Sequence, residues 1–131
     1  MTVARVEDLK TIPLFAGLEP SALEQLAEAA KEVDAPAGQL LTQPGAAGSG
    51  MFFVVEGIVE VEARQTWREL GPGDFFGELA LLRGDGTRTA RVRAKTDVRC
   101  VALDRAGFED LVRAHPDIAA TLLETALTRL N

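Results

Sequence analysis

The most informative stretch of the chain is GPGDFFGELALLRGDGTRTA, residues 71–90. Its Gly-Pro-Gly turn leads into a short apolar strand, and Gly77 then allows the backbone to approach a ligand closely. The residues from Glu78 to Leu82 are expected to form one helical turn, whose free N–H groups and positive dipole end favour an anion. A glycine-rich turn before a helix is weak evidence alone. Combined with the carboxylate and the arginine of the same stretch, it predicts an anion-binding loop.

The polar side chains of this stretch suit a cyclic phosphate diester on a ribose. Arg88 offers a planar donor fork that matches phosphate oxygens, and Thr89 adds a hydroxyl and a backbone donor. Glu78 is expected to accept a hydrogen bond from the ribose 2′-hydroxyl, the one free ribose hydroxyl of a 3′,5′-cyclic nucleotide. Two other interpretations stay open: Glu78 capping the helical turn, and Arg88 pairing with Asp85 at the surface.

The surrounding region, residues 33–103, is predicted to consist of short strands joined by glycine turns. Within it, Val59 and Val61 fall on one strand face while Glu60 and Glu62 fall on the other. The predicted strands cover residues 40–41, 51–55, 58–62, 67–70, 91–94 and 98–103. Short strands at regular spacing indicate an α+β fold that is mainly β, with a jelly-roll-like β-roll.

Helical patterns flank the strands on both sides. Residues 5–32 are predicted to be helical, with Ser21 as an N-cap and Glu24 in the capping-box position. Residues 104–131 are predicted to form two helices, the first capped by Asp104 and the second beginning at Pro116. The apolar stripe of the last helix is expected to form core, a lid over a ligand or a dimer seam; it comprises Ile118, Leu122, Leu123, Ala126, Leu127 and Leu130.

Composition narrows the class of protein. The 131 residues fit one domain, 1–131, and 47% hydrophobic residues can fill a core without metals or disulfides. A net charge of -6 argues against a nucleic-acid surface, and the single His115 cannot build a cupin-type metal site. No catalytic motif is present, so no enzyme is expected. Cys100 cannot form a disulfide within the chain, and neither a signal peptide nor a membrane span is recognised, so a cytoplasmic location is expected.

The chain resembles the cyclic nucleotide-binding domain family, which includes the bacterial catabolite activator protein and protein kinase A regulatory subunits. The stretch 76–82 followed by 88–90 is similar to the phosphate-binding cassette of that family, and it is the most specific part. Residues 12–18 resemble its N-terminal helical motif, residues 91–96 resemble the bacterial activator, and three glycines fall at its turns: Gly38, Gly45 and Gly57. The resemblance implies an eight-stranded β-roll flanked by helices, in which the last helix closes over the base.

Carried over residue by residue, the resemblance implies a ligand site made of Phe76, Gly77, Glu78, Leu79, Ala80, Arg88, Thr89 and Ala90, with Val61, Arg68 and Leu70 near the base. Strand alternation puts Arg68 on the same face as Leu70, where it could donate to guanine. Thr89 also suits cyclic GMP, but threonine occurs in domains that prefer cyclic AMP. Cyclic AMP is kept slightly ahead of cyclic GMP, as the commoner bacterial ligand in this resemblance.

The expected function is that of a regulatory sensor whose nucleotide repositions residues 104–131. No cofactor besides the nucleotide is expected. Neither a helix-turn-helix nor a membrane pore is recognised, so direct binding of DNA or membrane is not expected. The output is expected to pass to an effector protein or to an effector domain missing from this chain, and a homodimer through the C-terminal helix is possible. The alternative is a degenerate fold that binds no nucleotide and serves as a protein interaction module, with Asp85 near the phosphate position weakening binding.

Overall fold

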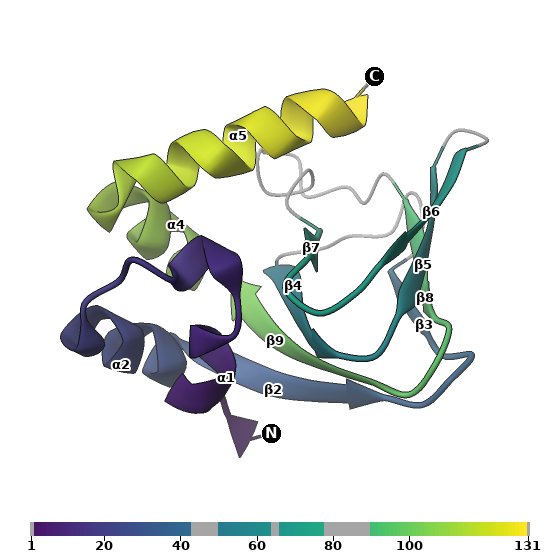
Figure 1. Cartoon of the computed structure of the whole chain (residues 1–131), viewed down its shortest axis with the longest axis horizontal. Coiled ribbons are helices and arrows are strands. Elements are labelled where there is room, and N and C mark those ends of the chain that lie inside the picture. The colour runs from purple at the N-terminus through teal and green to yellow at the C-terminus, as the bar shows by residue number, and fades with distance from the viewer. Residues whose placement is uncertain (1, 43–49, 64–65, 78–89, 131) are drawn as a thin grey trace.

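The computed structural model describes residues 2–42, 50–63, 66–77 and 90–130. In these residues the strands form two antiparallel sheets that face one another, with helices gathered on the far side of one of them (Figure 1). The five-stranded sheet has the order β1-β2-β9-β4-β7, and the four-stranded sheet has the order β3-β8-β5-β6. Chain neighbours β4 and β5 belong to different sheets, so the chain passes from one layer to the other, as in a β-roll.

Each of the six predicted strand ranges is matched to within one residue, whereas the two strands that lie before residue 36 were not predicted. The five-stranded sheet comprises β1 (Thr2–Val3), β2 (Ala30–Ala35), β4 (Gly50–Glu56), β7 (Phe75–Phe76) and β9 (Val98–Asp104). The four-stranded sheet comprises β3 (Leu40–Thr42), β5 (Val59–Ala63), β6 (Thr66–Leu70) and β8 (Arg91–Ala94). The eight strands β2 to β9 make up the predicted roll, and the short β1 pairs with β2 outside it.

The helices lie against the five-stranded sheet. They are α1 (Val6–Lys10), the 3₁₀-helix η1 (Pro13–Phe15), α2 (Pro20–Ala29), α4 (Arg105–Ala114) and α5 (Pro116–Leu130). Asp104 caps α4 by accepting a hydrogen bond from the Gly107 amide at 2.8 Å, as predicted. Pro116 is the first residue of α5, also as predicted. None of the helices in the described part of the chain has both the length and the apolar character that a membrane crossing requires.

The five-stranded sheet separates two apolar clusters. On β4, Met51 and Phe53 belong to the cluster shared with the helices, whereas Val54 belongs to the cluster enclosed between the two sheets. On β9, Val101 faces the helices and Cys100 faces the opposing sheet. Both faces of this sheet are therefore buried, which the alternation of side chains along a strand makes possible.

Two details of the predicted N-terminal region are wrong. The helix α2 begins at Pro20, with Glu19 in the N-cap position, so Ser21 is not the cap. A residue before proline is disfavoured in helical conformation, and proline suits the first helical position, so the helix starts two residues earlier than predicted. The helical region also ends at Ala29 rather than residue 32, because β2 pairs with β9 from Ala30 onward.

Candidate functional site

Of the predicted site residues, five lie outside the described residues: Glu78, Leu79, Ala80, Arg88 and Thr89. The remaining six lie within them, on β5, β6 and β7 and at the two borders of the segment 78–89. These six are Val61, Arg68, Leu70, Phe76, Gly77 and Ala90.

The border of the segment on the β7 side is fixed to β4. The Gly73 amide donates to the Val54 carbonyl at 2.8 Å, and the Val54 amide donates to the Asp74 carbonyl at 2.8 Å. The Asp74 side chain closes the turn by accepting from the Gly71 amide at 2.9 Å. This turn delivers the chain into β7, where Phe76 is buried. The predicted glycine turn and short strand therefore form a rigid entry to the segment.

Phe76 is held by a ring contact, whereas Gly77 is required for its backbone conformation. The Phe76 ring stacks on Phe52 of β4, with centroids 5.0 Å apart and an interplanar angle of 14°. Gly77 has a φ of 92°, a conformation that residues with a side chain rarely adopt. Any other residue at this position would be strained, so the chain needs glycine where it leaves β7.

The other border of the segment is fixed to the four-stranded sheet. The carbonyl of Ala90 accepts a hydrogen bond from the Thr42 hydroxyl at 2.9 Å, and Thr42 is itself buried. β8 follows immediately and pairs with both β3 and β5. The segment 78–89 therefore starts from an edge strand of one sheet and ends on an inner strand of the other. No local sequence pattern predicts this contact of Thr42, because it joins residues 48 positions apart.

Between these borders lies an apolar wall on the inner face of the four-stranded sheet. Val61 and Leu70 are buried, and both belong to the cluster that also contains Phe76 and, partly buried, Ala90. The structure thus brings together four of the predicted site residues. Because core residues of a β-roll occupy the same positions, this burial fits a packing role as well as a ligand contact.

Arg68 lies on the same face. It is directly opposite Val61 in the β5–β6 register, and residues opposite one another across strands point to the same side. Unlike Val61, Arg68 is exposed. The register therefore agrees with the predicted alternation that placed Arg68 and Leu70 on one face, while the exposed Arg68 also lines a surface hollow together with Glu60, Trp67 and Glu69. Trp67, expected to be partly buried, is 64% exposed and points to the opposite face.

The predicted apolar stripe of α5 divides into two faces. Ile118 and Leu122 belong to the helix-side cluster and Ala126 is also buried, so these three residues are core. Leu123 and Leu127 are more than half exposed. The spacing of four residues within each set explains the division, because such residues lie above one another on a helix.

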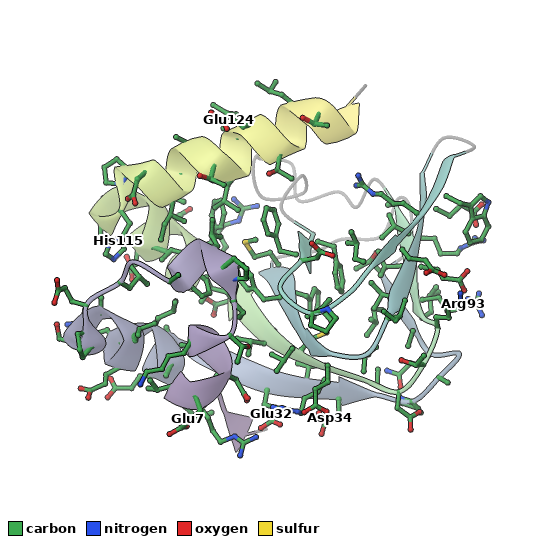
Figure 2. The ribbon with its side chains drawn as sticks, viewed as in Figure 1. Glu7, Glu32, Asp34, Arg93, His115 and Glu124 are labelled. Atoms are coloured by element: carbon green, nitrogen blue, oxygen red, sulfur yellow. The ribbon has the colours of Figure 1, made fainter. Side chains whose placement is uncertain are left out.

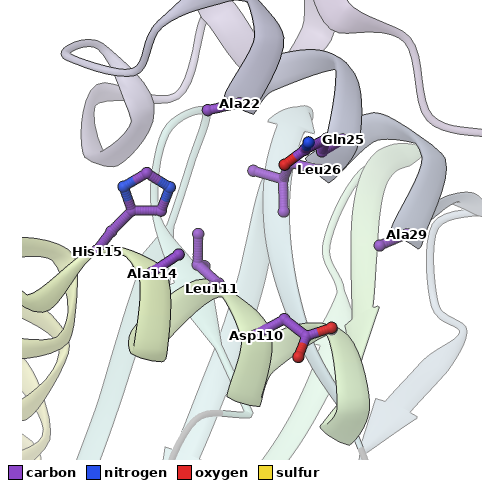
Figure 3. A pocket seen from close by; sticks show the side chains of 9 residues that line it. Ala22, Gln25, Leu26, Ala29, Asp110, Leu111, Ala114 and His115 are labelled. Carbon is purple, nitrogen blue, oxygen red and sulfur yellow. The ribbon is translucent and has the colours of Figure 1, made fainter.

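A cavity of about 150 Å³ lies elsewhere, between α2 and α4 (Figure 3). Its walls combine alanine, glycine and leucine residues with polar groups supplied by Gln25, Asp110 and His115. None of the six described site residues lines it. In the described part of the chain, no group of three or more His, Cys, Asp or Glu side chains is arranged to hold a metal ion.

Comparison with known proteins identifies the family. The family model described as the cyclic nucleotide-binding domain matches residues 32–115. The chain is 42% identical over 118 residues to a cyclic nucleotide-gated potassium channel of Rhizobium etli. The matched region covers 90% of this chain and 33% of the channel. It is 32% identical over 131 residues to a CRP-like cAMP-activated global transcriptional regulator of Mycobacterium tuberculosis, covering 95% of this chain and 58% of the regulator.

The fold agrees with these matches. The solved structure of cAMP-bound PfPKA-R (141-441) superimposes with a TM-score of 0.83 at 25% identity, covering 96% of this chain and 45% of that one. The matched part is a binding domain and not a catalytic one. This chain spans about a third of the channel and somewhat over half of the transcriptional regulator.

Proposed function

This chain belongs to the cyclic nucleotide-binding domain family, and we propose that it binds a 3′,5′-cyclic nucleotide at the segment 76–90 and acts as a regulatory sensor. The observation that carries the proposal is the meeting of Val61, Leu70 and Phe76 in one apolar cluster, at the borders of a glycine-rich segment that bears an arginine and a carboxylate. The apolar cluster supplies a surface for a base. The segment supplies donors for a phosphate and an acceptor for a ribose.

In this proposal Arg88 holds the cyclic phosphate, with Thr89 adding a hydroxyl, and Glu78 accepts the ribose 2′-hydroxyl. Hydrogen bonds to charged groups contribute ~1.5–3 kcal/mol each, so Arg88→Ala should weaken nucleotide affinity roughly 10- to 100-fold. Isothermal titration calorimetry measures this loss directly. The matched control is Arg113→Ala, which removes an exposed arginine on α4 and should leave affinity unchanged. Unchanged affinity in Arg88→Ala would refute the phosphate assignment.

We place cyclic AMP slightly ahead of cyclic GMP. The M. tuberculosis relative is named for activation by cAMP, and the PfPKA-R structure holds cAMP. Against this ranking stands Arg68, which lies opposite Val61 on the inner face and could donate to guanine O6 and N7. Paired titrations with both nucleotides decide between them. A preference for cyclic GMP that disappears in Arg68→Ala would reverse the ranking.

The signal is proposed to leave the site through residues 104–131. Ile118 and Leu122 anchor α5 in the helix-side core, and Ala126 is buried as well, so a shift of α5 must repack this core. Hydrogen exchange with and without nucleotide should show altered protection in α4 and α5. Equal protection in both states would contradict the sensor mechanism while leaving nucleotide binding intact.

The chain is not proposed to be an enzyme, so a cyclic nucleotide incubated with it should be recovered intact by chromatography. The proposed output is an effector protein or an effector domain, with no direct contact to DNA or membrane. The lone Cys100 needs no oxidising compartment, which suits the proposed cytoplasmic location. A homodimer through α5 would use the exposed Leu123.

The competing function is that of an interaction module that keeps the fold and binds no nucleotide. It is favoured by Asp85, a carboxylate inside the segment that would repel a phosphate if it points inward. Absence of heat with both nucleotides at millimolar concentration would favour this module over the sensor.

A further inference from the structure

The outer face of the four-stranded sheet points away from the helices and the other sheet. Figure 2 shows Arg93 projecting from it on the side opposite the helical layer. The residues of this outer face are Leu40, Glu60, Glu62, Trp67, Glu69, Arg91 and Arg93, with Lys95 just beyond β8. None of them belongs to either buried cluster of the described residues. Its most conspicuous member is Trp67, the largest side chain of the chain and 64% exposed.

The strand register arranges these side chains in two rows across the sheet. In one row Trp67 lies opposite Glu62, which lies opposite Arg91. In the other row Glu69 lies opposite Glu60, Glu60 opposite Arg93, and Arg93 opposite Leu40. As a result all the acidic residues of the outer face lie on β5 and β6. The basic residues Arg91 and Arg93 lie on β8, and Lys95 comes directly after it. The two exposed apolar residues lie on the two edge strands, Trp67 on β6 and Leu40 on β3.

Part of this charge is paired within the sheet. Arg91 contacts Glu62 at 3.9 Å, and Lys95 forms an ion pair with Glu69. Glu69 and, more weakly, Glu60 raise the pKa of Lys95. Arg93 donates to the Gly38 carbonyl at 3.4 Å, and no carboxylate of the described chain lies within ion-pair distance of it. Glu60 likewise has no cation of the described chain within that distance. These two opposite charges stand side by side on the two central strands, β5 and β8.

We propose that the outer face binds a second copy of this chain, face to face, about a two-fold axis that runs parallel to the strands between β5 and β8. Such an axis places β5 of one copy over β8 of the other. Glu60 of each copy then meets Arg93 of the other, so both central charges gain a partner in one symmetric contact. The acidic half of each face covers the basic half of the other.

The apolar residues fit the same arrangement. The axis that exchanges β5 and β8 also exchanges β6 and β3, because the sheet order is β3-β8-β5-β6. Trp67 of one copy therefore lies over the strand of the other copy that carries Leu40. Face-to-face sheets pack about 10 Å apart, a gap that tryptophan and long charged side chains can fill. A two-fold axis perpendicular to the strands would instead put acid on acid, and the charges disfavour it.

The test reverses the two central charges separately. In Glu60→Arg both faces present arginine at the centre, and in Arg93→Glu both present carboxylates. Sedimentation velocity over a range of concentrations should show a wild-type dimer, and each variant should weaken it at least about tenfold. Mixing the two variants in equal amounts should restore a dimer, because each then presents the charge that the other needs. Glu24→Arg and Arg113→Glu, on exposed helix surfaces, make the same changes of net charge and should leave the wild-type dimer intact.

Several outcomes overturn the proposal. The proposal is wrong if the wild-type chain stays monomeric up to millimolar concentration. It is also wrong if the wild-type dimer is unchanged in Glu60→Arg. A dimer that Leu123→Glu abolishes, while the outer-face variants do not, belongs to α5 instead. Failure of the two variants to associate when mixed refutes the Glu60–Arg93 contact specifically. Nucleotide titrations on the same variants are independent of these results, because Glu60 and Arg93 are not part of the proposed nucleotide site.

Discussion

Arg99 joins the N-terminal helix α1 to the five-stranded sheet. Its guanidinium donates to Asp8 of α1 at 2.5 Å and to Glu56 at 2.7 Å, and Glu32 of β2 lies 3.5 Å away. The Arg99 side chain is 19% exposed and the Asp8 side chain 9%. The carboxylates hold the pKa of Arg99 above its usual value. Replacing Arg99 by methionine would leave the Asp8 carboxylate buried, and among the described residues the Arg5 Nε at 3.5 Å would be its one remaining cationic partner.

The loss of folding stability in Arg99→Met comes mainly from the Asp8 carboxylate that is left buried. Removing one partner of a buried ion pair costs ~3–5 kcal/mol, and the neighbouring Arg5 moderates the effect. Glu56 is mostly exposed and contributes at most ~0.5 kcal/mol. We therefore expect Arg99→Met to lower the free energy of unfolding by about 3 kcal/mol, which corresponds to a fall in Tm of about 10 °C for a domain of this size.

Urea unfolding followed by far-ultraviolet circular dichroism measures this change. The matched control is Arg113→Met, whose pair with Asp110 spans 3.6 Å between side chains that are 75% and 79% exposed, and it should cost at most ~0.5 kcal/mol. The double variant Arg99→Met with Asp8→Leu should recover most of the loss, since it removes both buried charges. A cost below ~1 kcal/mol for Arg99→Met, or no recovery in the double variant, would refute the reasoning.

Three further predictions concern single positions. Burial raises the pKa of the Cys100 thiol to about 12, so the folded protein should resist thiol reagents at pH 8. The free energy of unfolding should fall as pH rises from about 9 toward 12, because in this range the Cys100 thiol ionises readily only in the unfolded chain. Gly57→Ala should destabilise the fold by more than ~2 kcal/mol in urea unfolding, since φ is +92° and a Cβ would lie 2.3 Å from the Asp97 carbonyl oxygen; a neutral result would contradict this geometry. Asp104→Ala should cost ~1 kcal/mol through loss of the bond to the Gly107 amide, and Asp104→Asn should retain most of it.

Local patterns were sufficient to predict most of the fold. The alternation of Val59 and Val61 with glutamates predicted β5 and its buried face, and Asp104 and Pro116 marked the starts of two helices. These features depend on residues within one turn or one strand, where propensity and capping act. The burial of Cys100 in an apolar strand was predicted in the same way and is confirmed.

Features that depend on distant partners were missed. β2 carries the sequence Ala-Lys-Glu-Val-Asp-Ala, whose strand character comes from pairing with β9 almost 70 residues away. The hydrogen bond from Thr42 to Ala90 and the stacking of Phe52 on Phe76 likewise need the folded register. In the candidate site, Val61, Leu70 and Phe76 were selected through a family resemblance, since an apolar strand residue alone does not distinguish core from ligand contact.

The two-residue strand β7 gives the molecule a mechanical property. Its neighbouring rings belong to different interiors: Phe75 lies 5.9 Å from Phe53 on the helix side, whereas Phe76 stacks on Phe52 between the sheets. Phe53 in turn lies 4.8 Å from Phe15 of η1. Phe75 and Phe76 are consecutive residues, so a displacement of Gly77 moves both rings together relative to β4, on which they pack. A displacement at Gly77 is therefore expected to reach both apolar clusters, including the one shared with the N-terminal helices.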